Sequence, residues 1–100
     1  MFKNQKYITC GIEEKVPTVI QLILWNLIDK LGKTQKLDYL QVFELAPVTQ
    51  DYQTVQQVIH SQEVPPYKET HYLTGSEPFS AKIFVIDDGT HSTMLLAQEY

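Results

Sequence analysis

Residues 81–89 read AKIFVIDDG, and this stretch decides the fold. Residues 81–87 are rich in β-branched and aromatic side chains and apolar on both faces except at Lys82, which predicts a central strand. Asp88-Gly89 is the signal of a type I′ hairpin, so we expect a return strand over residues 91–99. A helix over residues 93–100 is the alternative, because Met, Leu, Ala, Gln and Glu favour helices.

Further strands are predicted on the N-terminal side of this hairpin, at residues 6–12, 37–46, 53–63 and 67–73. Pro47 is expected to end the second of them. The Gln-rich strand 53–63 is expected to keep one face in water, and Pro65-Pro66 marks a break before an edge strand at 67–73. Together these segments predict a mostly antiparallel sheet of about five strands.

One long amphipathic helix is predicted over residues 17–31, beginning at Pro17 and stopping at a left-handed Gly32. Its start lacks a side-chain cap. Apolar residues fall on one helical face, which we expect to pack on the sheet: Val16, Ile20, Ile23, Leu24, Leu27 and Leu31. A hundred residues with one such helix and one sheet predict a single α+β domain.

Two large apolar side chains, Leu22 and Trp25, project from the opposite face of this helix, with Thr18 and Asp29 nearby. An apolar patch away from the core is typical of an association site, and Trp is a preferred anchor. We therefore predict a protein partner or a second copy of the chain at this surface. The alternative is that a terminus or the loop around Tyr67 covers the patch.

The charge of the chain argues against nucleic acid as the partner. The formal net charge is −4, and all eight basic residues are lysines. Without arginine there is no bidentate fork for phosphate or guanine. Lys30, Lys33 and Lys36 cluster after the helix, and we interpret them as a solvated helix end whose cations suit the helix dipole.

The sequence predicts a cytoplasmic protein that does not enter a membrane. Cys10 is the single cysteine, so no internal disulfide can form, as is usual in a reducing compartment. No apolar segment follows Lys3 and Lys6 in the manner of a signal peptide. The apolar stretch of the helix is interrupted by polar residues and is too short to span a bilayer.

The densest polar cluster is at the C-terminal hairpin, where Asp87, Asp88 and His91 could bind a small ligand or a metal. The alternative is that Asp-Gly makes the turn and the flanking hydroxyls cap it. His60, His71 and His91 do not have a metal-pair spacing. The chain has no nucleotide or nucleophile motif, so we predict no catalytic residue, no metal, no cofactor and no enzymatic activity.

Five stretches of the chain resemble a known family: MFKNQKYIT (1–9), LWNLID (24–29), LDYLQVFEL (37–45), HSQEVPPY (60–67) and AKIFVIDDGTHSTMLLAQEY (81–100). The family is the one of small staphylococcal and related Firmicute proteins called domain of unknown function 960. The resemblance spans essentially the whole chain, and its last stretch is the most specific. It implies a stand-alone cytoplasmic bacterial protein, sometimes carried on mobile elements, and assigns no functional residue.

Three functions follow from these observations. The first is a non-enzymatic protein-interaction module that uses Leu22, Trp25, Thr18 and Asp29. The second is a small-ligand or metal-binding protein with its site at Asp87, Asp88 and His91. The third is an inhibitor borne by a mobile element, for which a net charge of −4 is weak support.

Overall fold

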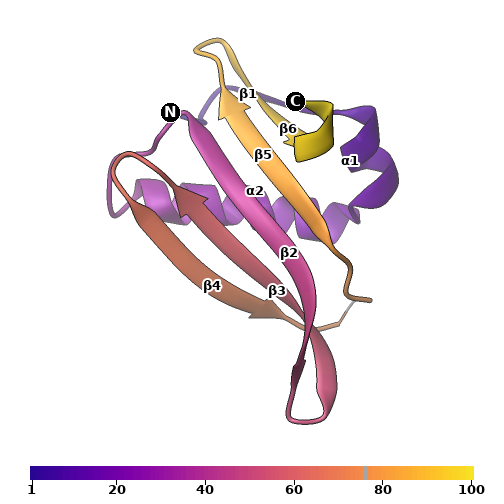
Figure 1. Ribbon diagram of the computed structural model, residues 1–100. Coiled ribbons are helices and arrows are strands. Elements are labelled where there is room, and N and C mark those ends of the chain that lie inside the picture. The colour runs from indigo at the N-terminus through magenta and orange to yellow at the C-terminus, as the bar shows by residue number, and fades with distance from the viewer. Residues whose placement is uncertain (76) are drawn as a thin grey trace.

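A six-stranded sheet, in the order β1-β6-β5-β2-β3-β4, forms the frame of the molecule in the computed structural model, which describes residues 1–75 and 77–100 (Figure 1). Its strands are β1 (Gln5–Ile8), β2 (Leu40–Gln50), β3 (Gln53–Gln62), β4 (Tyr67–Leu73), β5 (Ala81–Asp87) and β6 (His91–Leu96). All neighbours are antiparallel except β1 and β6, which are parallel. The α+β class is confirmed, with six strands instead of about five.

Three helical segments join these strands: α1 (Cys10–Lys15), α2 (Thr18–Gly32) and the short 3-10 helix η1 (Ala97–Glu99). The expected strand over 6–12 is therefore wrong beyond Ile8. Thr9 caps a helix there, because its hydroxyl accepts a hydrogen bond from the Ile12 backbone N–H at 3.3 Å. Neither α-helix in the described ranges is long and apolar enough to cross a membrane.

The long helix α2 crosses behind the sheet in Figure 1. Its buried face is rotated slightly from the expected one, since Ile23 and Leu27 are only partly buried; the buried residues are Ile20, Gln21, Leu24, Ile28 and Leu31. Pro17 makes no side-chain cap, as predicted. Gly32 is not left-handed. A Cβ atom there would lie 3.0 Å from Leu37 Cδ1, a close contact that a small shift of the Leu37 side chain would relieve.

The core lies between α2 and the inward-facing side chains of the middle strands. Phe43, Ile83 and Val85 are fully buried there. The prediction that 81–87 is a central strand is confirmed, because β5 lies between β2 and β6. The prediction that 67–73 is an edge strand is confirmed as well.

Pro47 does not end β2, which continues to Gln50. The pairing of β2 with β5 stops at Leu45, so Pro47 lies on a free edge where no neighbour needs its missing N–H. Beyond this point β2 and β3 project from the sheet as a two-stranded hairpin (Figure 1).

The type I′ turn is found in this projecting hairpin and not at Asp88-Gly89. Asp51 and Tyr52 have φ angles of 49° and 66°, as this turn requires at both central positions. In the C-terminal hairpin only Gly89 has a positive φ, of 97°. The return strand expected over 91–99 ends at Leu96, and η1 follows it.

Glu99 fixes this C-terminal turn to the start of α1. One carboxylate oxygen, Oε1, accepts hydrogen bonds from the Leu96 N–H at 2.8 Å and from the Thr9 hydroxyl at 2.6 Å. The other oxygen, Oε2, accepts from the Gly11 N–H at 3.2 Å. The last strand and the first helix are therefore held together by one side chain.

Candidate functional site

The four residues of the predicted helix surface do not form one compact patch. Leu22 is 59% exposed, and Thr18 and Asp29 are exposed, but Trp25 is partly buried and packs against the hydrophobic core. The Lys6 Nζ atom lies 5.5 Å from the centre of the Trp25 ring, so the Lys6 side chain covers part of the Trp25 side chain. Thr18 and Asp29 are about 16 Å apart along the helix axis, at 1.5 Å per residue.

Asp87, the first residue of the predicted hairpin site, is buried and serves the chain's own backbone. Its Oδ2 atom accepts a hydrogen bond from the Phe2 N–H at 2.7 Å, and its Oδ1 atom accepts from Gly89 N–H at 2.8 Å and Asn4 Nδ2 at 3.1 Å. Burial alone would raise the pKa of this carboxyl group, but the hydrogen bonds from Phe2, Gly89 and Asn4 lower it below its usual value.

Asp88 and His91 lie beside each other on the exposed turn. Asp88 Oδ1 accepts hydrogen bonds from the N–H groups of Thr90 and His91, both at 3.0 Å, and from the Thr90 hydroxyl at 2.9 Å. These bonds hold the pKa of Asp88 at about 2. Asp88 Oδ2 lies 3.1 Å from His91 Nε2. The structure thus brings Asp88 and His91 together, whereas the Asp87 carboxylate is directed to the Phe2 backbone and Asn4.

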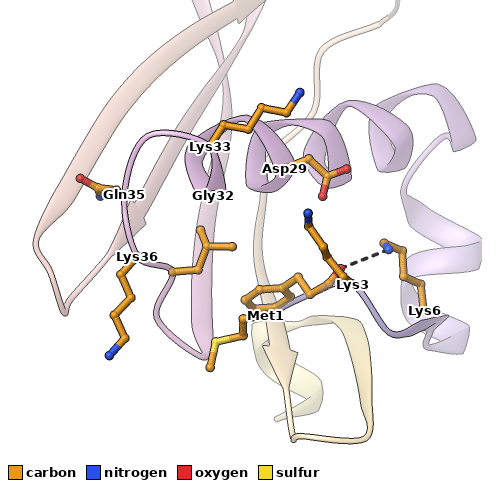
Figure 2. Close-up of a pocket in the computed structure, with 10 residues that line it drawn as sticks. Met1, Lys3, Lys6, Asp29, Gly32, Lys33, Gln35 and Lys36 are labelled. Carbon is orange, nitrogen blue, oxygen red and sulfur yellow. Dashed lines mark hydrogen bonds between the residues drawn. The ribbon is translucent and has the colours of Figure 1, made fainter.

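A cavity of about 690 Å³ lies where the N-terminal segment meets the end of α2 and the loop that follows it (Figure 2). Half of the eight lysines of the chain line it, against one of its twelve acidic residues, Asp29. The lining residues are Met1, Phe2, Lys3, Lys6, Asp29, Gly32, Lys33, Gln35, Lys36 and Leu37. The cavity is therefore a basic region on an acidic protein.

The wall of this cavity is fixed through Asp87. The Phe2 N–H donates a hydrogen bond to the Asp87 carboxylate, and this bond holds the Phe2 backbone in place. Phe2 is 1% exposed and has a positive φ of 63°. The carbonyl oxygen of Phe2 in turn accepts a hydrogen bond from Lys6 Nζ at 3.2 Å (Figure 2). The residue that was predicted as a ligand acts instead on the position of the segment that carries Lys3 and Lys6.

A second polar feature is a buried chain of side chains on β2 and β3. His60 Nε2 lies 2.7 Å from Gln41 Oε1, and Gln41 Nε2 donates to Gln62 Oε1, also at 2.7 Å. Burial, with His71 as a further cause, lowers the pKa of His60 to about 4. β3 keeps one face partly exposed, at Gln57, Ile59 and Ser61, but the face that carries Gln56, His60 and Gln62 is buried.

The face of the sheet opposite α2 carries a third feature, an apolar cluster on three adjacent strands. Leu40 is paired with Ile86, Val42 with Phe84, and Phe84 with Leu95. Leu40, Val42, Phe84 and Ile86 are each partly exposed. The ring of Tyr100 packs edge-on against Phe84 at 5.6 Å between centroids, and a Lys82–Glu44 ion pair of 3.8 Å lies at the margin. We call these residues the outer sheet face.

Comparison with known proteins places the chain in a family. A family model described as a staphylococcal protein of unknown function, DUF960, matches residues 5–99. The chain belongs to the DUF960 family. It is also similar to a crystal structure of a protein of unknown function from Enterococcus faecalis, with 27% identity, a TM-score of 0.80, and coverage of 97% of this chain and 91% of that one. No curated protein matches the sequence.

The sequence of this DUF960 chain does not predict the lysine cavity. Its pattern indicates Lys33 and Lys36 only as part of a helix end together with Lys30, which lines a separate, smaller cavity of about 300 Å³ beside Tyr67. Lys3 and Lys6 are about thirty residues away in the sequence. Nothing in the local pattern indicates that the two groups meet.

Proposed function

We propose that this DUF960 protein is a non-enzymatic interaction module that forms a homodimer through the outer sheet face. The observation that carries the proposal is the set of apolar cross-strand pairs Leu40–Ile86, Val42–Phe84 and Phe84–Leu95. An antiparallel sheet with one solvated face normally alternates apolar and polar residues, with the polar ones outward. Here Leu40 and Val42 of β2, Phe84 and Ile86 of β5 and Leu95 of β6 are outward and apolar as well.

The outward positions of β3 and β4, on the other half of the same face, carry more polar residues than those of the apolar cluster. On β3 and β4 the outward positions next to this cluster carry Ser61, Lys68 and Thr70, with Ile59 as an apolar residue among them. The outward apolar residues are therefore denser over β2 and β5 than over β3 and β4, and an apolar patch of this kind is typical of association surfaces.

A second copy of the chain is the occupant that fits the charges. The charged residues at outward positions of the paired strands are Glu44, Lys68 and Lys82, and Glu44 already faces Lys82. When two chains of net charge −4 meet at this face, each Glu44 carboxylate is accompanied by Lys82 of its own chain. A two-fold symmetric contact would pair the same cluster with itself.

The size of the cluster sets the expected strength. Three strands about 4.8 Å apart, with about 10 Å of each in the cluster, cover on the order of 150 Å², which is far below the ~800 Å² per partner of a standard interface. We therefore expect a weak dimer whose population depends on protein concentration.

The outer helix face remains a second candidate surface, because Leu22 and its neighbour Val19 are 59% and 54% exposed. Its predicted anchor, Trp25, is partly engaged with the core and with Lys6. This surface therefore lacks the free aromatic anchor that the sequence predicts for it.

A binding role without catalysis is supported by the way acid–base groups are used. The carboxylates of Asp87 and Asp88 accept backbone hydrogen bonds, and the imidazole of His60 is buried against Gln41. Cys10 is an exposed free thiol, which is in keeping with the proposed cytoplasmic location.

The test is the molar mass in solution at several concentrations, by light scattering behind a sizing column, for wild type, Phe84→Gln and Leu22→Gln. A dimer lost only in Phe84→Gln, with an unchanged circular dichroism spectrum, is the expected result. A dimer lost only in Leu22→Gln would move the interface to α2. A monomer at every concentration would overturn the homodimer.

A further inference from the structure

We propose that the lysine cavity binds a small organic phosphate. A volume of about 690 Å³ lies within the range of about 300–1,000 Å³ that is typical of small-molecule sites. The cavity gathers Lys3, Lys6, Lys33 and Lys36, with Asp29 as its one acidic residue. This site is separate from the outer sheet face, so the inference does not depend on the proposed dimer.

The first two lysines come from the N-terminal segment and are placed by the fold. Lys6 is held by the Phe2 carbonyl oxygen and the Trp25 ring. In Figure 2 the Lys3 ammonium group points toward Asp29, but the ion pairs in the described residues do not include one between them. Cations gathered without carboxylate partners repel one another, and a bound anion would remove that repulsion.

The other two lysines come from the opposite side, after α2. Lys33 and Lys36 are exposed, and Figure 2 shows their side chains extending outward. They can turn toward a ligand, but the lost rotamer freedom would reduce the affinity. We therefore expect a dissociation constant between about 0.1 and 1 mM. A lysine ammonium acts as a point charge toward phosphate, so a dianion gains more than a monoanion.

The apolar part of the lining indicates that the ligand has an organic body. Met1 and Leu37 line the cavity, and long lysine stems add further apolar surface. A free inorganic phosphate would use the ammonium groups and leave this surface in water. A phosphate attached to a flat apolar group would use both.

Two features oppose an anion, and they give the proposal a second test. Asp29 is a negative charge in the lining, and the cavity lies at the C-terminal end of α2, where the helix dipole is negative. Removing the Asp29 charge is therefore expected to strengthen binding of a phosphate, about twofold.

The experiment is a titration of the ¹⁵N-labelled chain with phenyl phosphate, followed by amide chemical shifts. We expect shifts at Lys3, Gly32, Lys33 and Leu37, and clearly weaker binding of benzoate, inorganic phosphate and the uncharged phenol. Lys3→Gln/Lys33→Gln should weaken binding about fivefold to tenfold, and Asp29→Asn should strengthen it. The matched control Lys15→Gln/Lys68→Gln removes the same charge elsewhere and should leave the affinity within twofold.

Three results would overturn the proposal: no shift in the cavity at 10 mM phenyl phosphate, equal binding of phenol, or an equal loss in the control variant. The amide spectra of the free variants show whether each is folded before its titration is interpreted.

Discussion

The Asp87 carboxylate accepts a hydrogen bond from the Phe2 backbone N–H at 2.7 Å, across 85 positions of the sequence. This bond joins the end of β5 to the N-terminal segment and so fixes one wall of the lysine cavity. Asn4 strengthens the connection, because its Nδ2 donates to Asp87 while its Oδ1 accepts from the Ser92 hydroxyl at 2.6 Å.

Replacing Asp87 by Asn is expected to lower the free energy of unfolding by about 2 kcal/mol, which is typical for hydrogen bonds to a charged group. The uncharged amide accepts more weakly and carries an N–H₂ group that can face the Phe2 or Gly89 N–H. Urea unfolding at pH 7 measures the change. Asp88→Asn on the exposed turn is the control and should cost clearly less; equal losses would contradict the special role of Asp87.

The lowered pKa of Asp87 also predicts the direction in which the folding stability changes with pH. A carboxyl group whose pKa is lower in the folded state stabilises that state above the pKa of the unfolded chain. This contribution is lost as the pH falls through the folded-state pKa. Below pH about 4 the unfolding curves of wild type and Asp87→Asn should therefore converge.

His60 predicts a loss of stability in mild acid. Its pKa is about 4 in the folded protein, because the ring is buried, and about 6.5 in an unfolded chain. The unfolded state therefore binds the proton first, and stability that is fully present above pH 6.5 is lost as the pH falls toward 4. The loss is on the order of 3 kcal/mol.

Urea unfolding at half-unit steps between pH 7 and 4 would show this slope. In His60→Gln the slope over that window should flatten, whatever the stability of the variant at pH 7. His91→Gln is the control, since His91 is only partly buried on the outer turn and should leave the slope in place. A wild-type stability that is constant over the window would contradict the buried neutral His60.

Tyr52 offers a stabilising substitution at the tip of the β2–β3 hairpin. Its side chain is fully exposed and its φ is 66°, a conformation that costs a residue other than glycine about 1–2 kcal/mol. Glycine adopts it freely but loses more chain entropy on folding. Tyr52→Gly is therefore expected to gain about 0.5 kcal/mol, or about 2–4 °C in melting temperature.

Calorimetry of Tyr52→Gly beside Thr49→Gly tests this account. Thr49 lies within β2 in the same hairpin, where glycine should destabilise the strand. Two variants that both lose stability would show that the backbone at Tyr52 stores no strain.

Elements with strong local patterns were predicted well from the sequence. The strand over 81–87 matches β5 residue for residue, and 67–73 matches the edge strand β4. The predicted helix differs from α2 by one residue at each end. The predictions were wrong where contacts with distant segments determine the structure. β2 continues through Pro47 because β5 no longer pairs with it there. Residues 97–99 form η1, in which Glu99 is bound to Thr9.

The candidate sites were predicted less well, for a related reason. Asp87, Asp88 and His91 are close in sequence, but only Asp88 and His91 lie side by side, and only the fold shows that the Asp87 carboxylate is used by Phe2. The sequence placed Trp25 on the correct helix. The contact between Lys6 and the Trp25 ring depends on the tertiary position of β1 relative to α2.

By itself, then, the sequence determined the α+β class, the central hairpin and the amphipathic helix, because side-chain periodicity and turn residues act between near neighbours. The tertiary structure decided that β1 joins β6 in parallel, that Gln41, His60 and Gln62 are buried together, and that Lys3 and Lys6 meet Lys33 and Lys36. These contacts join residues far apart in the chain, so they depend on strand order and not on any local pattern.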